Sequence, residues 1–383
     1  MKSRRPLDGI RVMEMAGLAP APYCGMVLSD FGADVVVVDR VPKRGVKGPE
    51  IMAVNPFDFG KRWIQIDLRM NSGADVAWRM IRDYDVLIEP YRPGVMESLG
   101  LGPDDALKVN PKLIYARLTG WGQAGPAACF GGHDMNYIAL SGALSRFRRR
   151  GERPLPPCNL LGDFAGGSLL CAMGILLSLI ERGKSGKGQV IDAAMVDGAA
   201  YLSTVLYGLF ANGLISGESG TNMIDGGAPF YQVYETLDGK FLAVGAIEEK
   251  FYSQLLEGIG IEASSFPDQN ATERWPEMIA TLQKQFKTKT REEWNAIFKE
   301  KDACVTPILE LSEVADHPHN SERKLLVSVD GFLRPAPTPR LSRTPGKAPI
   351  ERRPKGYDTE EVLKELGYSD KQIQAFYADS VVG

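Results

Sequence analysis

The sequence predicts an α/β protein built on a doubly wound, mostly parallel sheet with a smaller α+β domain. Strand-like and helix-like segments alternate through the N-terminal third, and some strand segments, such as residues 33–39 (ADVVVVD), are continuously apolar. Continuous apolar runs are typical of strands buried on both faces of a parallel sheet. Repeated β-α-β units form a sheet that binds ligands at the carboxyl ends of its strands.

The elements of this part follow from their local patterns. Pro20 precedes a helix that Gly32 ends, in keeping with proline at helix starts and glycine at helix ends. An alternating pattern predicts a strand at 63–68, and Pro, Gly and Lys make residues 41–60 a loop. The other strands are predicted at 10–15, 85–91 and 113–118, and the helices at 21–30, 72–83 and 94–107.

Three glycines follow the fifth predicted strand, at Gly120, Gly122 and Gly125, and they spell GxGxxG. A dinucleotide-binding fingerprint requires a helix to open directly after such a motif. Pro126 comes next and no continuous helix pattern begins there. We therefore interpret the segment as a loop that shapes a reaction site.

Two potential proton carriers open the helix-like segments that follow. His133 comes after two glycines, and Asp163 precedes small residues, Ala165, Gly166, Gly167 and Ser168. Small residues let a ligand or another backbone approach closely. Each carrier also has a simpler interpretation, His133 as a satisfied histidine at a helix cap and Asp163 as a plain N-cap.

The rest of the chain predicts a second domain and a return to the first. A helix to about residue 182, a strand at 190–195 and a helix at 197–210 precede a Gly-rich linker at 213–229. Asp238-Gly239 predicts a hairpin, residues 316–349 are Pro/Arg-rich and extended, and helices close the chain at 360–366 and 370–377. The predicted domains are 1–212, completed by 323–383, and 230–322.

Composition restricts the class of protein. The five cysteines lack CxxC spacing, which favours neither a metal site nor a disulfide framework and suits a reducing, intracellular compartment. The net charge of −3 argues against nucleic-acid binding, and no uninterrupted apolar run predicts a membrane span. No targeting signal identifies a mitochondrion, peroxisome or cytoplasm.

Positive charge nevertheless gathers near the second and third predicted strands. Such a cluster is either a solvated face or a local site for a phosphorylated ligand. The cluster consists of Arg40, Lys43, Arg44, Lys47, Lys61, Arg62 and Arg69.

The order and spacing of several segments resemble the α-methylacyl-CoA racemases, which belong to the family III coenzyme A transferase superfamily. The segments are GLAPAPYCGMVLSDFGADVV, IEPYRPGVMESLGLGP, LIYARLTGWGQAGP, GHDMNY, NLLGDFAGG, GKGQVIDAAMVDG, NMIDGGAPFY, VGAIE and DACVTP. The resemblance covers nearly the whole chain. It implies an interlocked homodimer whose active site lies between the large domain of one subunit and the small domain of the other.

The resemblance also implies an activity, the interconversion of (2R)- and (2S)-2-methylacyl-CoA thioesters, with no metal or redox cofactor. His133 and Asp163 would act on opposite faces of the α-carbon, and Glu248 would orient the histidine. Backbone N–H groups at the helix start, including that of Asp134, would stabilise the enolate-like intermediate. The alternatives are a family III CoA transferase with Asp163 as nucleophile, and a non-catalytic CoA-binding protein.

The resemblance also implies which residues bind coenzyme A, and most but not all of these positions match the family. Val37 and Ser98 stand where the family has Arg or Lys, and each loses a phosphate contact. The residues that match the family's binding segments are Arg40, Ile66, Asp67, Leu68, Arg69, Arg92, Gly132, Asp134, Met135, Asn136 and Tyr137.

Overall fold

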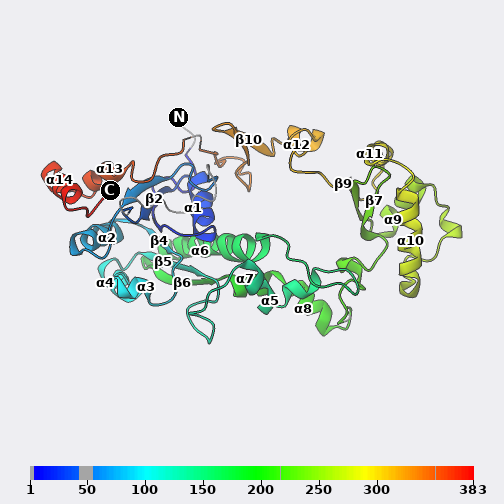
Figure 1. Cartoon of the computed structure of the whole chain (residues 1–383), viewed down its shortest axis with the longest axis horizontal. Helices are drawn as coiled ribbons and strands as arrows, with labels where there is room; N and C mark the ends of the chain where they lie inside the picture. The colour runs from blue at the N-terminus through cyan, green and yellow to red at the C-terminus, as the bar shows by residue number, and fades with distance from the viewer. Residues whose placement is uncertain (1–3, 43–54, 216, 350) are drawn as a thin grey trace. The chain divides into compact units, whose positions relative to one another are not determined.

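The computed structural model describes residues 4–42, 55–215, 217–349 and 351–383, and the structural statements below concern these residues. The chain divides into two compact units, each described by itself (Figure 1). Unit 1 comprises Met1–Ser141, Cys158–Leu202 and His319–Gly383, and unit 2 comprises Gly142–Pro157 and Ser203–Pro318. The predicted linker at 213–229 falls within unit 2, and the predicted domain limits remain predictions.

Unit 1 is built on a six-stranded sheet, in the order β3-β2-β1-β4-β5-β6, and every neighbouring pair of strands is parallel. This confirms the predicted α/β class. The strand expected at 190–195 joins the sheet beside β5. The strands are β1 (Arg11–Met15), β2 (Asp34–Asp39), β3 (Arg62–Gln65), β4 (Val86–Glu89), β5 (Ile114–Thr119) and β6 (Gln189–Ala194).

Helices cover both faces of this sheet, which explains why strands such as β2 (DVVVVD) and β4 (VLIE) are largely apolar and buried. Val12 of β1 belongs to a core with helices α1 (Pro20–Asp30), α5 (Asp134–Leu140), α6 (Leu170–Ser185) and α7 (Met195–Leu202). Its neighbour Met13 belongs to a core on the other face. The helices of that face are α2 (Asn71–Asp83), α3 (Val95–Ser98), α4 (Pro103–Val109), α13 (Thr359–Glu365) and α14 (Asp370–Ala378).

A π-helical segment, η2 (Leu160–Leu169), continues directly into α6. Asp163 was expected to open this helix, but the helix begins at Leu160 and Asp163 lies in its first turn. The small residues allow close packing, since a Cβ on Gly166 would lie 2.8 Å from the backbone nitrogen of Ala199 in α7. By length and composition Leu160–Ser185 could cross a membrane, contrary to the sequence analysis, although core helices of soluble proteins pass the same test.

Three segments differ from the sequence predictions. The helix expected at 94–107 is interrupted at Gly100, whose φ of +71° ends α3. The helix expected at 197–210 breaks at Ser203 into α7 and α8 (Thr204–Ala211). The segment expected to be extended at 316–349 holds α12 (Pro318–Glu322) and a hairpin, β10 (Leu326–Val329) with β11 (Phe332–Pro335). Asp330-Gly331, both at positive φ, form its turn, a signal that the sequence analysis missed.

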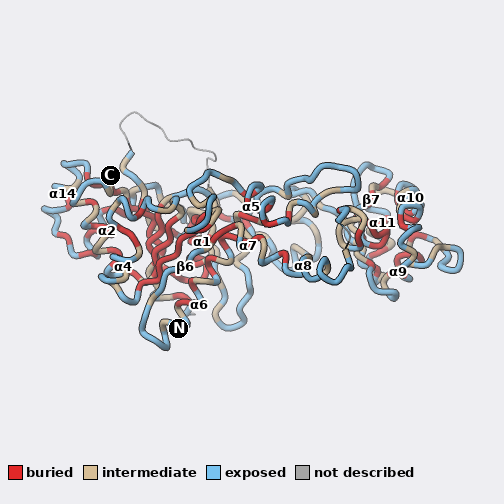
Figure 2. Tube along the Cα trace, turned by 90° about the horizontal axis from the view of Figure 1, so that it is seen from below, coloured by how far each residue is buried: buried red, intermediate tan, exposed pale blue. Residues whose placement is uncertain are grey.

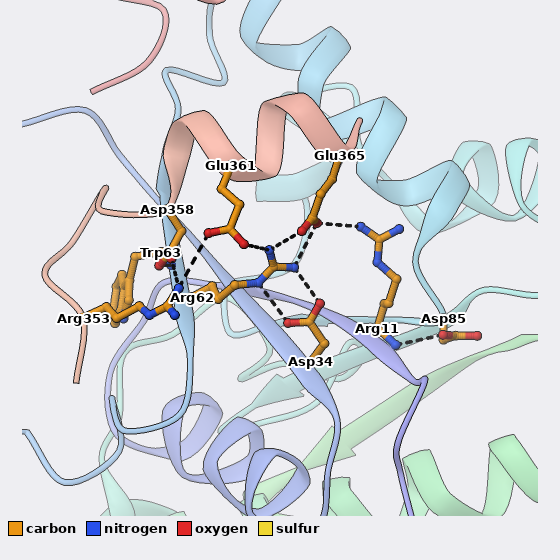
Figure 3. A network of polar contacts seen from close by, with 9 residues as sticks. All are labelled: Arg11, Asp34, Arg62, Trp63, Asp85, Arg353, Asp358, Glu361 and Glu365. Carbon is orange, nitrogen blue, oxygen red and sulfur yellow. Dashed lines mark hydrogen bonds and ion pairs between the residues drawn. The ribbon is translucent and has the colours of Figure 1, made fainter. Parts of the chain in front are cut away.

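The C-terminal segment returns to β3 through a network of charges (Figure 3). Arg62 of β3 donates to Asp34 of β2, with an Nη2–Oδ2 distance of 2.6 Å, and to Glu365 of α13, with an Nη1–Oε1 distance of 2.7 Å. The carboxylate of Asp358 accepts a hydrogen bond from the backbone N–H of Trp63 and pairs with Arg353. The last helices are therefore fixed to the edge strand that they cover.

Unit 2 has its own antiparallel sheet and its own core of buried residues (Figure 2). The predicted hairpin at Asp238-Gly239 is confirmed, because β7 (Tyr231–Glu235) and β8 (Phe241–Gly245) pair on either side of it. Tyr234 stacks on Phe286 with ring centroids 4.9 Å apart. The remaining elements are β9 (Val305–Pro307), α9 (Glu249–Ile259), α10 (Trp275–Phe286), α11 (Arg291–Phe298) and the single turns η1 (Ala143–Arg146), η3 (Met223–Asp225), η4 (Ala263–Ser265) and η5 (Thr272–Arg274).

A buried ion pair joins the returning hairpin to the first helix, and it predicts a stability effect. Arg334 of β11 donates to Asp30 of α1 with an Nη2–Oδ2 distance of 2.6 Å, and both side chains are buried. Replacing Arg334 by Met should lower the free energy of unfolding by about 3–5 kcal/mol, because Asp30 is left as an uncompensated buried charge. Urea denaturation at pH 7.5 measures the loss.

The exposed Arg343 of the same segment supplies the control, and Arg343→Met should change stability by less than about 0.5 kcal/mol. Burial raises the pKa of Asp30 to about 6, against the opposing charge of Arg334. This group therefore favours the folded state in acid and loses that contribution as the pH rises through about 6. The deficit of Arg334→Met should accordingly shrink in acid, and equal stability of variant and wild type at every pH would contradict the assignment.

Candidate active site

A cavity of about 1180 Å³ lies in unit 1 at the carboxyl ends of the central strands. Its lining includes the residues after β4 and β5, the N-terminus of α1, and both His133 and Asp163. Parallel sheets bind their ligands at this edge. Apolar side chains, among them Leu18, Phe57 and Phe130, form much of the wall, as expected of a site for a small organic ligand.

His133 precedes the first residue of α5 with an extended backbone, as the sequence predicts. Its backbone N–H donates to the side-chain oxygen of Asn136, at 3.0 Å. A hydrogen bond fixes the glycine that precedes this histidine, because the hydroxyl of Tyr137 donates to the carbonyl of Gly132 at 2.5 Å. Trp121 packs edge-on against Tyr137, with centroids 4.8 Å apart. The glycine loop thus shapes the cavity wall beside the histidine.

Asp163 is half-buried in the first turn of η2. The side-chain amide of Asn159 donates to its Oδ2 at 3.2 Å. Burial raises the pKa of Asp163 above that of an ordinary aspartate, while the Asn159 hydrogen bond opposes the shift. The negative charge of Asp134 raises this pKa further, and His133 lowers it. The carboxyl group therefore holds its proton more tightly than an exposed aspartate does.

Asp134 connects the two segments that carry His133 and Asp163. It is 3% exposed, and its Oδ2 accepts hydrogen bonds from the backbone N–H groups of Gly162, at 2.5 Å, and of Asp163, at 2.8 Å. Its other oxygen, Oδ1, is buried and makes no hydrogen bond within the described chain. The side chain of Asp134 thus faces the protein, whereas the sequence analysis placed the residue among those that bind the ligand.

The structure brings only some of the predicted binding residues to the cavity. Arg92, Gly132 and Tyr137 line it, beside His133 and Asp163. Met135 and Asn136 lie on exposed positions of α5. Arg40 is exposed beyond the end of β2, where its charge acts on the cavity residue Tyr91.

The segment from Ile66 to Arg69 is not part of the cavity lining. Ile66 is buried and its backbone bridges to Val382. Leu68 packs against the sheet core, and Arg69 forms an ion pair with Asp67, with an Nη2–Oδ2 distance of 2.7 Å. These residues, which the sequence analysis expected to bind coenzyme A, thus contact other parts of the protein and do not line the cavity.

The predicted basic cluster is likewise divided among several roles. Lys61 is buried, and its Nζ donates to both carboxylate oxygens of Glu14 and to the carbonyl of Pro22. Arg62 holds the C-terminal segment and Arg69 pairs with Asp67. Lys43, Arg44 and Lys47 lie outside the described residues. Most of the described cluster is thus engaged within the chain, and Arg40 is its remaining exposed candidate for a ligand.

The two positions that depart from the family pattern differ in their surroundings. Val37 is 1% exposed in the middle of β2. Ser98 is exposed at the end of α3, where its hydroxyl donates to the carbonyl of Val95. The valine thus contributes apolar surface to the sheet at its position.

Sequence reasoning missed one wall of the cavity, formed by residues 352–355 of the returning C-terminal segment. Lys355 is held there by Asp39, with an Nζ–Oδ2 distance of 2.9 Å. Trp121 was missed as well, and its indole N–H is buried without a hydrogen-bond partner in the described residues. Local sequence patterns carry no signal for contacts of such long range, although the cluster of basic residues around Pro354 was visible.

Glu248 lies in unit 2, on the exposed residue before α9. Its carbonyl accepts the backbone N–H groups of Phe251 and Tyr252. Across residues 4–42, 55–215, 217–349 and 351–383, no three His, Cys, Asp or Glu side chains form a group that could hold a metal ion.

Comparisons with known proteins agree with this architecture. The chain is 50% identical over 379 residues to α-methylacyl-CoA racemase of Mus musculus, with 98% of this chain and 97% of the relative covered. It is 48% identical to α-methylacyl-CoA racemase of Homo sapiens, with the same coverage. The β subunit of succinyl-CoA–L-malate CoA-transferase from Chloroflexus aurantiacus is 31% identical, with 98% of each chain covered.

A solved structure and a family model complete the comparison. A CAIB/BAIF family protein from Brucella suis has a TM-score of 0.81 at 23% identity, covering 95% of this chain and all of that one, and so shares the fold. The model of CoA-transferase family III matches residues 7–359. The chain therefore belongs to CoA-transferase family III.

Proposed function

We propose that this protein is a racemase that interconverts (2R)- and (2S)-2-methylacyl-CoA thioesters by 1,1-proton transfer. The observation that carries the proposal is that two proton carriers, His133 and Asp163, line one cavity at the carboxyl ends of the sheet. The names of the mouse and human relatives support the same reaction. Neither residue is needed merely to bind a thioester.

The α-proton beside a thioester is removed by one carrier, and the electrons move into the carbonyl to give an enolate-like intermediate. The other carrier then delivers a proton to the opposite face of the same carbon, which inverts the centre. The enolate oxygen is stabilised by backbone N–H groups at the very start of α5. Asp134 supplies one of these backbone donors. The N–H of Asn136, further along this turn, already donates to the carbonyl of His133.

A CoA transferase is the second candidate, since one relative bears that name. In that reaction Asp163 attacks the thioester carbonyl and forms an acyl anhydride, and coenzyme A leaves. That chemistry requires one carboxylate and gives no role to His133. The pairing of His133 with Asp163 in the cavity favours the racemase.

The reaction is tested by incubating a (2R)-2-methylacyl-CoA in deuterium oxide and following α-proton exchange together with epimerisation. We expect His133→Ala and Asp163→Ala each to lower epimerisation by about 10²–10⁴-fold, the usual contribution of a general acid or base. Exchange on one face should persist, because the opposite carrier remains.

The exposed residues His319 and Asp104 provide matched controls, and His319→Ala and Asp104→Ala should both retain wild-type rates. Epimerisation at wild-type rate in His133→Ala or Asp163→Ala would remove that residue from the mechanism. Acyl transfer without epimerisation in the wild type would favour the transferase.

Coenzyme A phosphates require cationic side chains at the mouth of the cavity. Arg92, Arg352 and Lys355 line it, and we propose that the exposed Arg40 joins them. A charge-assisted hydrogen bond contributes about 1.5–3 kcal/mol, or about ten- to a hundredfold in affinity. Arg40→Ala should raise the Michaelis constant for acyl-CoA by that factor and leave the turnover number nearly unchanged.

Steady-state kinetics separates this role from that of a solvated surface charge. Lys347 is an exposed cation that does not line the cavity, and Lys347→Ala should leave both parameters unchanged. A Michaelis constant that also stays unchanged in Arg40→Ala would eliminate the phosphate role.

The active assembly is a homodimer in this proposal. One face of α6 is buried through Cys171, Ala172 and Ile175, whereas its opposite face exposes apolar side chains. A contiguous exposed apolar surface on a helix marks an interaction site. The exposed residues of this face are Met173, Leu176, Leu177 and Ile180 of α6, with Leu169 at the end of η2.

In the same proposal, Glu248 in unit 2 of one subunit orients His133 of the other, as the resemblance implies. Sedimentation should therefore show a dimer, and Leu177→Glu combined with Ile180→Glu should give inactive monomers, because a buried charge opposes association. Leu311→Glu, at a residue 92% exposed in unit 2, is the control and should remain dimeric. A fully active wild-type monomer would contradict the proposal, and binding of the wild type to lipid vesicles through α6 would assign the face to a membrane.

A further inference from the structure

We propose that the side chain of Asp134 is the positioning element that fixes the two proton carriers relative to each other. The inference rests on the proposed racemase reaction and extends it, because it assigns a task to a carboxylate that touches neither the α-carbon nor coenzyme A. Asp134 accepts a hydrogen bond from the backbone N–H of Asp163, and it is bonded directly to His133 in the chain.

The first half of the link is covalent. Asp134 directly follows His133 and is the first residue of α5. Any displacement of the Asp134 backbone therefore moves His133, and it also moves the N–H group that faces the enolate oxygen. One residue thus fixes the position of a proton carrier and of an oxyanion donor.

The second half of the link is a pair of charge-assisted hydrogen bonds. The N–H groups of Gly162 and Asp163 belong to the first turn of η2, where backbone donors lack partners within the helix. Both donate to Oδ2 of Asp134, at 2.5 and 2.8 Å. Bonds to an ionised acceptor are about twice as strong as neutral ones. The start of η2 is therefore tied to the start of α5.

Close packing leaves this link little freedom to move. Asp134 is 3% exposed, and a Cβ on Gly162 would lie only 2.8 Å from its Oδ2. The absent side chain at position 162 thus allows the carboxylate to reach two consecutive N–H groups. Reactions between held groups are sensitive to such geometry, and a displacement of about 1 Å costs about 10²-fold in rate.

Asp134 also contributes electrostatically. The groups that act on the carboxyl of Asp163 are Asn159, which precedes η2, and His133, Asp134 and Tyr137 at the start of α5. Burial is the main cause of the raised pKa of Asp163, and the charge of Asp134 raises it further. Removing that charge should lower the pKa, so that Asp163 loses its proton at lower pH.

Two substitutions separate position from charge. Asp134→Asn keeps a carbonyl oxygen that can accept hydrogen bonds from both N–H groups. Its amide nitrogen would replace Oδ1, which accepts no hydrogen bond within the described chain. Asp134→Ala removes the acceptor altogether. Asp104→Asn, at an exposed aspartate in the first turn of α4, is the matched control for the change in net charge.

The first measurement does not depend on activity. Hydrogen–deuterium exchange of Asp134→Ala should be faster across η2, residues 160–169, and unchanged in α6, while Asp134→Asn should retain most of the protection. Unaltered protection at 160–169 in Asp134→Ala would overturn the link, whatever reaction the protein catalyses. A failure of wild-type protein to epimerise would instead refute only the proposed function.

The second measurement is the pH dependence of epimerisation. Asp134→Ala should lose about 10²-fold in turnover number with a smaller change in the Michaelis constant, and Asp134→Asn should recover much of the loss. The acid limb of kcat/KM should move to lower pH in Asp134→Asn and stay in place in Asp104→Asn. Wild-type turnover in Asp134→Ala would overturn the positioning role, and an acid limb that does not move in Asp134→Asn would overturn the electrostatic role.

Discussion

A parallel sheet must be covered on both faces, and this requirement organises unit 1. The N-terminal part of the chain places α1 and α6 on one face and α2 and α4 on the other. The region over β3 is completed only by α13 and α14, which the chain supplies after passing through unit 2. Arg62 fixes the C-terminal segment to the sheet, because its guanidinium donates to both Asp34 of β2 and Glu365 of α13. Unit 1 is discontinuous in sequence for that reason.

The same C-terminal segment builds part of the candidate active site. Residues 352–355, which precede α13, form a wall of the cavity that holds His133 and Asp163. Ion pairs hold the surroundings of this cavity in place, since buried Lys61 joins Glu14 of the sheet to the carbonyl of Pro22 in α1. An unpaired charge at such a depth would be costly. Lys61 and Lys355 are thus engaged in ion pairs within the chain, whereas Arg40 is exposed.

The sequence predicted what depends on local pattern. The strands of the sheet, the start of α5 at His133 and the Asp238-Gly239 hairpin all follow from periodicity or turn chemistry and are confirmed. Contacts between distant segments left no such signal, so the ion pairs of Lys61 and the wall at 352–355 were not predicted. The break at Ser203 shows a further limit, because the sequence analysis expected one helix across it, whereas α7 ends at Leu202, where unit 1 gives way to unit 2.

The surroundings of Asp163 suit a reaction that runs in both directions. In the proposed reaction, the proton that one carrier removes from the α-carbon is replaced by the other carrier, so a large difference between their proton affinities would slow one direction. An exposed aspartate has a pKa near 3.9 and a free imidazole one near 6.5. Burial and the neighbouring Asp134 both raise the pKa of Asp163 and so bring the carboxyl closer to an imidazole. The half-buried π-helical turn and the carboxylate bound to its backbone therefore act in the same direction, since both raise the pKa of Asp163.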